Sequence, residues 1–273
     1  MDEVVTGASG GPLYRGRLAP TPSGYLHAGH GQTFRIAWER ARERGGKVVL
    51  RNDDLDAQRC RPEYQEAMFE DLRRFGLDWD EGPDREGPRG PYAQSARRPL
   101  YQKYWDQLCR ERKIYPSPHS RKDVRAALSA PHEEGGQSGE ALFPASLRPA
   151  PDWEYPAEGE AINWRFRVPD GETISFVDGR MGACSFTAGE DFGDFLVWRK
   201  DGFPSYEFAT VVDDHLMGIT EVVRGEDLLL STARQILLYR VLDWPVPDFY
   251  HCPLVRDAAG QRLAKRQGSP RAD

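Results

Sequence analysis

The chain has 273 residues, which is enough for one large domain or two smaller ones with a sizeable core. Apolar residues make up 39% and charged residues 29%, and no apolar run approaches the ~18 residues that span a bilayer, so a membrane protein is excluded. The net charge of -6 excludes a general nucleic-acid binder, although a local basic patch could still hold a polyanion.

The amino-terminal segment does not resemble a secretory signal. It opens with two acids and lacks both a basic region and an apolar stretch, and we expect residues 1–13 to be flexible. No C-x-x-C or C-x-C pair occurs, because the cysteines stand far apart, at Cys60, Cys109, Cys184 and Cys252. This spacing argues against a disulfide framework and against a zinc knuckle, and we expect a cytoplasmic protein.

The first regular elements are a strand, a helix and a second strand. Residues 14–19 predict a short strand followed by a P-T-P-S-G turn, and residues 47–51 predict a buried strand. Between them, residues 31–44 predict a helix, because one helical face collects Phe34, Ala37, Trp38 and Ala41. Such a β-α-β unit predicts parallel strands covered by helices, and thus an α/β fold.

The next segments are helical and then irregular. Residues 62–76 and 97–113 carry apolar residues at helical spacing. Residues 129–160 contain five prolines and predict an insertion with little regular structure.

A hairpin is predicted where residues 163–179 turn at Pro169–Gly171. The expected inward side chains alternate along its first strand, at Trp164, Phe166 and Val168. Strand and helix signals resume at 195–215, 221–225 and 231–244.

The strongest candidate site lies in RLAPTPSGYLHAGHGQT, residues 17–33. His27 and His30 flank Gly29 directly before the predicted helix, where backbone N–H groups and the helix dipole favour an anion. Glycine lets a phosphate chain approach the backbone, and two imidazoles could donate to a transferring phosphate. The alternative is a turn that simply uses these residue types.

A second candidate lies in RNDDLD, residues 51–56, at the end of the second predicted strand. Ligands of an open parallel sheet sit outside the carboxyl ends of its strands, so Asp53, Asp54 and Asp56 should face the same crevice as the histidines. An aspartate there can pair with a substrate ammonium group. For each of the three, a strand-end turn with a solvated acidic face stays an equal alternative.

Two further candidates lie in the carboxyl-terminal half. Tyr206 could line a pocket, although alone it would more often be a core residue, and Arg224 offers a planar fork suited to a carboxylate. In GQRLAKRQG, residues 260–268, two or three cations could grip a polyphosphate, although alone this would be a solvated basic loop. A local turn and salt-bridge cluster with no substrate role could account for Asp213, Asp214 and His215.

Together these segments resemble the catalytic domain of class I aminoacyl-tRNA synthetases of the glutamyl type. RLAPTPSGYLHAGH is similar to the family's R-F-A-P-S-P-T-G-x-L-H-x-G-x opening, with the HIGH signature at residues 27–30, and RLAKR, residues 262–266, resembles the KMSKS loop. The resemblance implies an α/β fold with a Rossmann-like parallel sheet and an inserted small mixed α/β lobe. The catalytic domain would comprise residues 14–110 and 191–273, with the lobe at 111–190.

The resemblance also implies residue roles. Arg17 and Arg224 would lie near a substrate carboxylate, and Asp53 would hold the α-amino group. The full set that would bind L-glutamate is Arg17, Ala19, Thr21, Asp53, Tyr206 and Arg224. ATP would be bound by His27, Gly29, His30 and Lys265, and catalysis would depend on His27, His30 and Lys265 together with Mg²⁺.

Three features depart from the family pattern. Asp53 is one methylene shorter than the usual glutamate, and Arg262 and Ala264 replace a lysine and a serine of the loop, which leaves Lys265 as its main cation. The chain also ends seven residues beyond Arg266, so we expect no anticodon-binding domain. In this it resembles the truncated branch of the family, the glutamyl-queuosine tRNA(Asp) synthetases.

Many members of that branch bind zinc in the inserted lobe. The matching positions here are Ser117, His119, Phe143 and Leu147. One hydroxyl, one imidazole and two apolar side chains cannot complete a four-ligand site, so we predict no structural zinc and no other resident metal. A weaker alternative combines His119, His132 and an acid such as Asp123.

The resemblance implies a monomeric ligase that activates L-glutamate with ATP and transfers it to queuosine in the anticodon of tRNA(Asp). The alternatives are a catalytic fragment of a glutamyl-tRNA synthetase that charges tRNA(Glu), a nucleotidyltransferase that acts on a phosphorylated small molecule, and an inactive RNA-binding relative. Arg17, Tyr206 and Arg224 argue against the nucleotidyltransferase.

Overall fold

The computed structural model describes residues 13–56, 58–85, 87–120, 123–124, 142–156 and 161–255. The segment expected to be flexible, residues 1–13, lies outside the described residues except for Leu13, and so does the predicted loop at 262–266.

The predicted β-α-β unit is confirmed. β1 (Arg15–Leu18) and β2 (Lys47–Leu50) pair in parallel, and α1 (Ala28–Glu43) connects them. The helix turns its predicted face inward, since Ala37 is 2% and Ala41 0% exposed. α1 begins at Ala28 rather than at Gly31, because the side chains of His27 and His30 cap its first turn.

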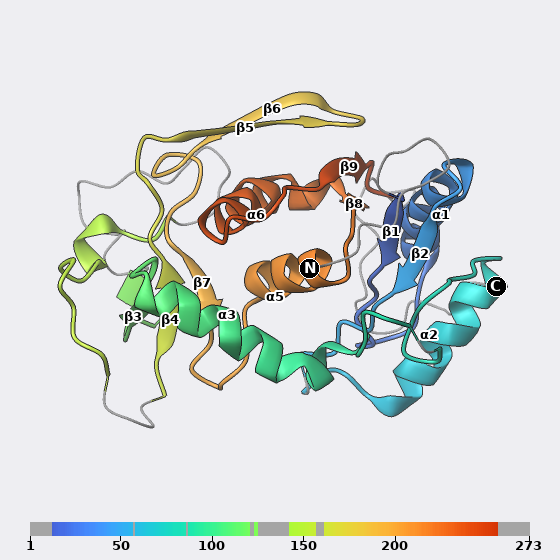
Figure 1. The fold of residues 1–273 in the computed structure, drawn as a ribbon, viewed down its shortest axis with the longest axis horizontal. Helices are drawn as coiled ribbons and strands as arrows, with labels where there is room; N and C mark the ends of the chain where they lie inside the picture. Colours follow the sequence, from blue (N-terminus) through green and yellow to red (C-terminus); the bar gives the residue numbers. More distant parts are fainter. Residues whose placement is uncertain are drawn as a thin grey trace.

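A second, larger sheet continues the parallel arrangement. β8 (Glu221–Gly225), β9 (Asp248–Cys252) and β5 (Thr173–Asp178) run in parallel, and β6 (Gly182–Thr187) is antiparallel at the edge. The N–H of Thr220 donates to the carbonyl of Arg15 at 2.9 Å, which joins this sheet to β1. α5 (Tyr206–Leu216) and α6 (Leu229–Val241) pack together beneath the β5–β6 ribbon in Figure 1. The predicted α/β class is confirmed.

A smaller antiparallel sheet forms the other end of the molecule. It consists of β3 (Ile114–Ser117), β4 (Asn163–Phe166) and β7 (Phe195–Trp198). In Figure 1, α3 (Arg98–Arg110) leads from this lobe towards α2 (Pro62–Arg74) and the β1–β2 pair. The described part of the predicted irregular stretch, residues 142–156, has the 3-10 helix η2 (Ala145–Leu147) as its only regular element. The domain boundaries at 110 and 190 stay a prediction.

The predicted hairpin across Pro169–Gly171 is wrong. β4 pairs with β3 and β7, whereas β5 pairs with β6 and β9, so the turn carries the chain from one sheet to the other. Polar contacts hold this crossing: Asp170 pairs with Arg148, and Asp194 accepts the Val168 N–H at 2.9 Å. The inward positions were predicted correctly, since 6% or less of each is exposed at Trp164, Phe166 and Val168.

Two clusters of buried side chains stabilise these elements. The smaller cluster joins β1, β2, α1 and α2 around Leu18, Leu50 and Leu72. The larger cluster runs from the antiparallel lobe through α3 and α5 to α6. Within the described ranges, no helix combines the length and apolar character needed to cross a bilayer.

Candidate active site

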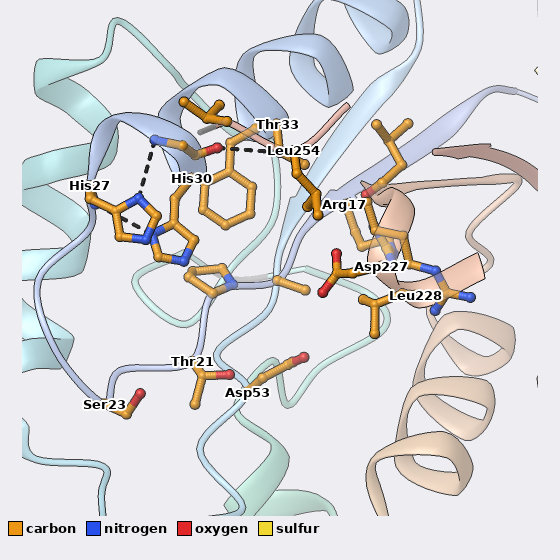
Figure 2. Close-up of a pocket in the computed structure, with 18 of the residues that line it drawn as sticks. Arg17, Thr21, Ser23, His27, His30, Thr33, Asp53, Asp227, Leu228 and Leu254 are labelled. Atoms are coloured by element: carbon orange, nitrogen blue, oxygen red, sulfur yellow. Dashed lines mark hydrogen bonds between the residues drawn. The ribbon is translucent and has the colours of Figure 1, made fainter. Parts of the chain in front are cut away.

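A cavity of about 650 Å³ opens at the carboxyl ends of the parallel strands. Ligands of open parallel sheets bind at this edge. Figure 2 shows His27 and His30 at one side of the cavity, Asp227 and Leu228 at the other, and Thr21 and Asp53 below. Of the ten residues predicted to bind glutamate or ATP, nine line this cavity: Arg17, Ala19, Thr21, His27, Gly29, His30, Asp53, Tyr206 and Arg224. The tenth, Lys265, lies outside the described residues.

The two histidines form the cap of α1. Nδ1 of His27 accepts the Gly29 N–H at 3.2 Å, and Nδ1 of His30 accepts the His27 N–H at 3.3 Å. A neutral imidazole whose Nδ1 accepts carries its hydrogen on Nε2, so each ring has a donor there. The prediction of backbone N–H groups open to an anion needs correction for Gly29, because His27 already binds that group. An anion at this helix start would meet the imidazole Nε2–H groups.

Buried ion pairs connect Asp53 to Arg17. Arg51 is 1% exposed, and its guanidinium donates to Asp53 and to Asp214, each at 2.6 Å. Arg17 pairs with the same Asp214 oxygen at 3.5 Å. Burial raises the pKa of Asp53 to about 6, against the opposing charge of Arg51. The Arg51–Asp214 pair thus fixes both Asp53 and Arg17 at the cavity.

Arg17 has few partners for a buried cation. It is 5% exposed, its Nη1 donates to the carbonyl of Val223 at 2.7 Å, and its Nε has only the 3.5 Å ion-pair contact with Asp214 and no hydrogen bond in the described part of the chain. A guanidinium has five N–H donors, and leaving buried donors unsatisfied is costly. A carboxylate in the cavity would supply acceptors for the Arg17 N–H groups that no described residue binds.

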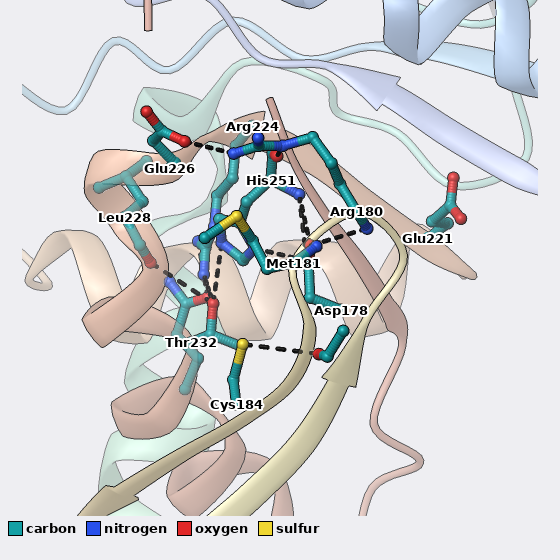
Figure 3. A network of polar contacts seen from close by, with 12 residues as sticks. Asp178, Arg180, Met181, Cys184, Glu221, Arg224, Glu226, Leu228, Thr232 and His251 are labelled. Carbon is teal, nitrogen blue, oxygen red and sulfur yellow. Dashed lines mark hydrogen bonds and ion pairs between the residues drawn. The ribbon is translucent and has the colours of Figure 1, made fainter. Parts of the chain in front are cut away.

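Arg224 is held from three sides. It is 5% exposed and donates to His251 Nε2 at 3.2 Å, Gln235 Oε1 at 2.9 Å and Thr232 Oγ1 at 2.7 Å (Figure 3). Among the described residues, these bonds use three of the five guanidinium N–H groups and leave two for a ligand. A guanidinium fixed in this way suits the planar, two-oxygen geometry of a carboxylate.

Tyr206 is a cavity residue and not a core residue. It is the first residue of α5 and is 46% exposed. The Ser205 side chain caps this helix by accepting the Phe208 N–H at 3.3 Å. The cap fixes the backbone at Tyr206, and thus the point from which its side chain extends.

Two of the predicted acids have structural partners in the protein. Asp54 accepts the backbone N–H of Ser95 at 2.8 Å and its hydroxyl at 2.7 Å, and Asp56 pairs with Arg59 at 2.5 Å. The turn alternative therefore fits Asp56, while Asp54 binds Ser95, 41 residues along the chain, and Asp53 faces the cavity.

The local cluster suggested for residues 213–215 is wrong. Asp213 accepts from Arg97 at 2.6 Å and from Tyr101 at 2.9 Å, and Asp214 binds Arg51, so both aspartates reach partners far along the chain. His215 stacks on Trp244 with 3.9 Å between ring centroids.

Sequence reasoning missed several residues at the site. Arg51 and Asp227 line the cavity, and His251 is a buried partner of Arg224. The arginine had a visible signal, because it ends a predicted buried strand and stands two residues before Asp53. The histidine had none, since its partners come from β5, β8 and α6, which are separate segments of the chain.

The positions considered for zinc hold other contacts. Ser117 is 1% exposed and its Oγ accepts from Arg165 Nε at 3.3 Å, while the His119 ring lies 6.3 Å from that of Phe143. The described residues contain no group of three or more His, Cys, Asp or Glu side chains that could hold a metal ion. His132 lies outside them, so the absence of zinc stays a prediction.

Known proteins share this architecture. Residues 14–272 match the family described as tRNA synthetases class I (E and Q), catalytic domain. Two proteins named Glutamyl-Q tRNA(Asp) synthetase are similar: one from Symbiobacterium thermophilum is 48% identical over 93% of this chain and 78% of its own, and one from Nitratidesulfovibrio vulgaris is 45% identical over 94% and 79%. The family resemblance drawn from the motifs is confirmed.

A solved structure agrees with these relatives. The crystal structure of a glutamate tRNA ligase from Elizabethkingia meningosepticum, in complex with its amino acid, is 32% identical with a TM-score of 0.77. The match covers 93% of this chain and 52% of that one, so the chain spans about half of that ligase.

Proposed function

Because the chain belongs to the class I tRNA synthetases of the glutamate and glutamine type, and to their glutamyl-Q tRNA(Asp) branch, we propose that it activates L-glutamate with ATP and transfers it to queuosine in the anticodon of tRNA(Asp). We further propose that it acts as a monomer in the cytoplasm.

One observation carries the glutamate assignment: two arginines, each 5% exposed, line the same cavity as Asp53. Arg17 and Arg224 retain donors for carboxylate oxygens, and Asp53 offers a carboxylate for an ammonium group. A ligand with two carboxylates and one ammonium group satisfies this set. A neutral amide in place of the side-chain carboxylate would leave buried positive charge without a partner, which a site of this kind rejects strongly.

The first step joins glutamate to AMP. An oxygen of the α-carboxylate attacks the α-phosphorus of ATP, the bond to the leaving pyrophosphate breaks, and glutamyl-adenylate forms. Asp53 and the arginines would hold glutamate in place, while the Nε2–H groups of His27 and His30 would donate to phosphate oxygens. Mg²⁺ bound to the phosphates would neutralise part of their charge. Lys265 would act from the predicted loop.

The second step transfers the glutamyl group to RNA. A hydroxyl on the cyclopentene ring of queuosine attacks the carbonyl carbon of the adenylate, and AMP leaves with the electron pair of the broken anhydride bond. The anticodon loop must therefore enter the cavity. Single-stranded loops are bound through phosphate contacts and base stacking, which requires basic and aromatic side chains near the entrance.

A second candidate acceptor is the terminal adenosine of tRNA(Glu). The similarity to a glutamate–tRNA ligase of Symbiobacterium thermophilum, which is 40% identical over 93% of this chain, favours this candidate. Both candidates share the first step and differ only in the RNA.

Side-by-side charging separates the candidates. Radiolabelled glutamate is offered with ATP and three RNAs: queuosine-containing tRNA(Asp), the same tRNA without queuosine, and tRNA(Glu). We expect label on the modified tRNA(Asp) alone. Label on tRNA(Glu) would establish the second candidate, and absence of glutamate-dependent ATP–pyrophosphate exchange without RNA would indicate an inactive relative.

A further inference from the structure

A chain of buried hydrogen bonds reaches the cavity through His251. This residue is fully buried, with 0% of its surface exposed, and lies on β9 between β5 and β8. Its Nδ1 is 2.7 Å from an Asp178 oxygen, and its Nε2 is 3.2 Å from Arg224 Nε (Figure 3). An acid, an imidazole and the cavity arginine are therefore connected in one line.

The acid determines which imidazole nitrogen carries the hydrogen. Although burial opposes its ionisation, the N–H groups of Met181 and Arg180 donate to Asp178 and help to hold its pKa below the usual range. Burial and the charge of Arg224 lower the pKa of His251 against the opposing effect of Asp178, and this lowering favours the neutral ring. A neutral imidazole beside a carboxylate donates from Nδ1, and Nε2 is then an acceptor.

Nε2 is the acceptor that Arg224 needs. The Nε–H of an arginine can only donate, and in the described part of the chain His251 is the only acceptor recorded for it. Gln235 and Thr232 accept hydrogen bonds from Nη1 and Nη2 of Arg224. The bond from Nε to His251 fixes the orientation of the guanidinium plane. All three contacts together aim the two remaining donors.

We infer that His251 is a positioning residue: as a neutral acceptor oriented by Asp178, it holds the Arg224 guanidinium in the orientation that receives a substrate carboxylate. The inference rests on the proposed function for the identity of that carboxylate, which is glutamate. His251 itself would touch no substrate and would act only through Arg224.

Two amide substitutions separate this role from simple packing. The amide of His251→Gln reaches the former position of Nε2 and offers an oxygen to Arg224. The shorter amide of His251→Asn reaches only the level of Nδ1, so it can contact Asp178 but not Arg224. We expect the Asn variant to raise the KM for glutamate about tenfold or more in pyrophosphate exchange, the typical cost of one unsatisfied buried donor, with kcat and the KM for ATP little changed. The Gln variant should stay close to the wild type.

Nuclear magnetic resonance tests the same role without any substrate. The Nε–H signal of Arg224, assigned by its loss in Arg224→Lys, should exchange slowly with water in the wild type and in His251→Gln, and faster in His251→Asn. In the wild type, the nitrogen shifts of His251 should show hydrogen on Nδ1 and none on Nε2, which needs no variant to fold.

Equal glutamate KM in the two amide variants, or hydrogen on Nε2 of His251, overturns the inference. Failure of the proposed function looks different: the wild type would then show no glutamate-dependent exchange, while the Arg224 Nε–H signal would still report whether His251 holds the guanidinium.

Discussion

Asp53 shows how one residue at this site balances burial against charge. Its side chain is 10% exposed and bonded to Arg51, yet burial outweighs that attraction and raises its pKa to about 6. Because the folded pKa lies above the ordinary value of 3.8, the protonated form is favoured between these values. The carboxylate that would bind an ammonium group is thus lost as pH falls through about 6, and not near 4.

The pH profile of glutamate activation should show this group. We expect kcat/KM for glutamate to fall on the acid side of about pH 6, while the KM for ATP changes little. Asp53→Asn should lower kcat/KM about 100-fold at pH 7.5 and flatten the acid side, because it removes one partner of a buried charge pair. Asp53→Glu keeps a carboxylate and should keep an acid limb. An unchanged limb in the Asn variant would show that another group titrates.

Gly29 leaves space for the His27 ring. A Cβ at this position would lie 3.1 Å from Cε1 and Nδ1 of that ring, closer than ordinary contact. Gly29→Ala should therefore displace the ring and weaken ATP binding about tenfold, as expected for one lost charge-assisted hydrogen bond, with glutamate binding preserved. Gly24→Ala is the matched control, because no described residue lies within 4 Å of a Cβ added there. Calorimetric titration with ATP should distinguish the two, and equal affinities would argue against a phosphate role for His27.

At the scale of elements, periodicity predicted which segments are helices and strands, but not where each begins or pairs. The helix predicted from Gly31 begins at Ala28, and its cap residue His27 is not among the usual cap residues, which are Ser, Thr, Asp and Asn. The hairpin prediction failed because alternation along β4 marks one buried face whatever the partner strand is. Pairing of β5 with β9, which follows it by about seventy residues, leaves no local signal.

Substitution of the α5 cap tests how a helix start supports the cavity. Ser205 accepts the Phe208 N–H at 3.3 Å and precedes Tyr206, which lines the cavity. Ser205→Ala should lower the free energy of unfolding by about 1 kcal/mol, the usual cost of losing a cap, and raise the KM for glutamate modestly. Ser205→Thr keeps the hydroxyl and should recover both. Denaturant unfolding measures the first effect, and a stability equal to that of the wild type would show that this cap contributes nothing.

Over the whole molecule, buried ion pairs join elements that the sequence gives no reason to connect. Arg51 at the end of β2 meets Asp214 on α5, and Arg97 before α3 meets Asp213 on the same helix. The motifs predicted the cavity residues because a family pattern records them. These supporting pairs were not predictable, since any of the many charged residues could have formed them; only the folded chain selects partners 163 and 116 residues apart.

Asp213 tests how far this network determines the site. It is 0% exposed, binds Arg97, Tyr101 and Gln94, and lies 3.8 Å from Arg51, which holds Asp53. Asp213→Asn leaves Arg97 buried without its counter-charge and should lower the free energy of unfolding by about 3 to 5 kcal/mol. Asp106→Asn, exposed on α3, should change it by less than roughly 0.5 kcal/mol.

Adding Arg97→Met to Asp213→Asn separates the lost pair from a general disturbance of α5. The Met side chain removes the buried charge that Asp213→Asn leaves unpaired. The double variant should therefore be more stable than the sum of the two single losses predicts. Urea unfolding of the four proteins gives the coupling free energy. If the losses simply add, Arg97 and Asp213 act independently, and the link from α3 through α5 to Arg51 and the cavity does not carry the energy that its geometry indicates.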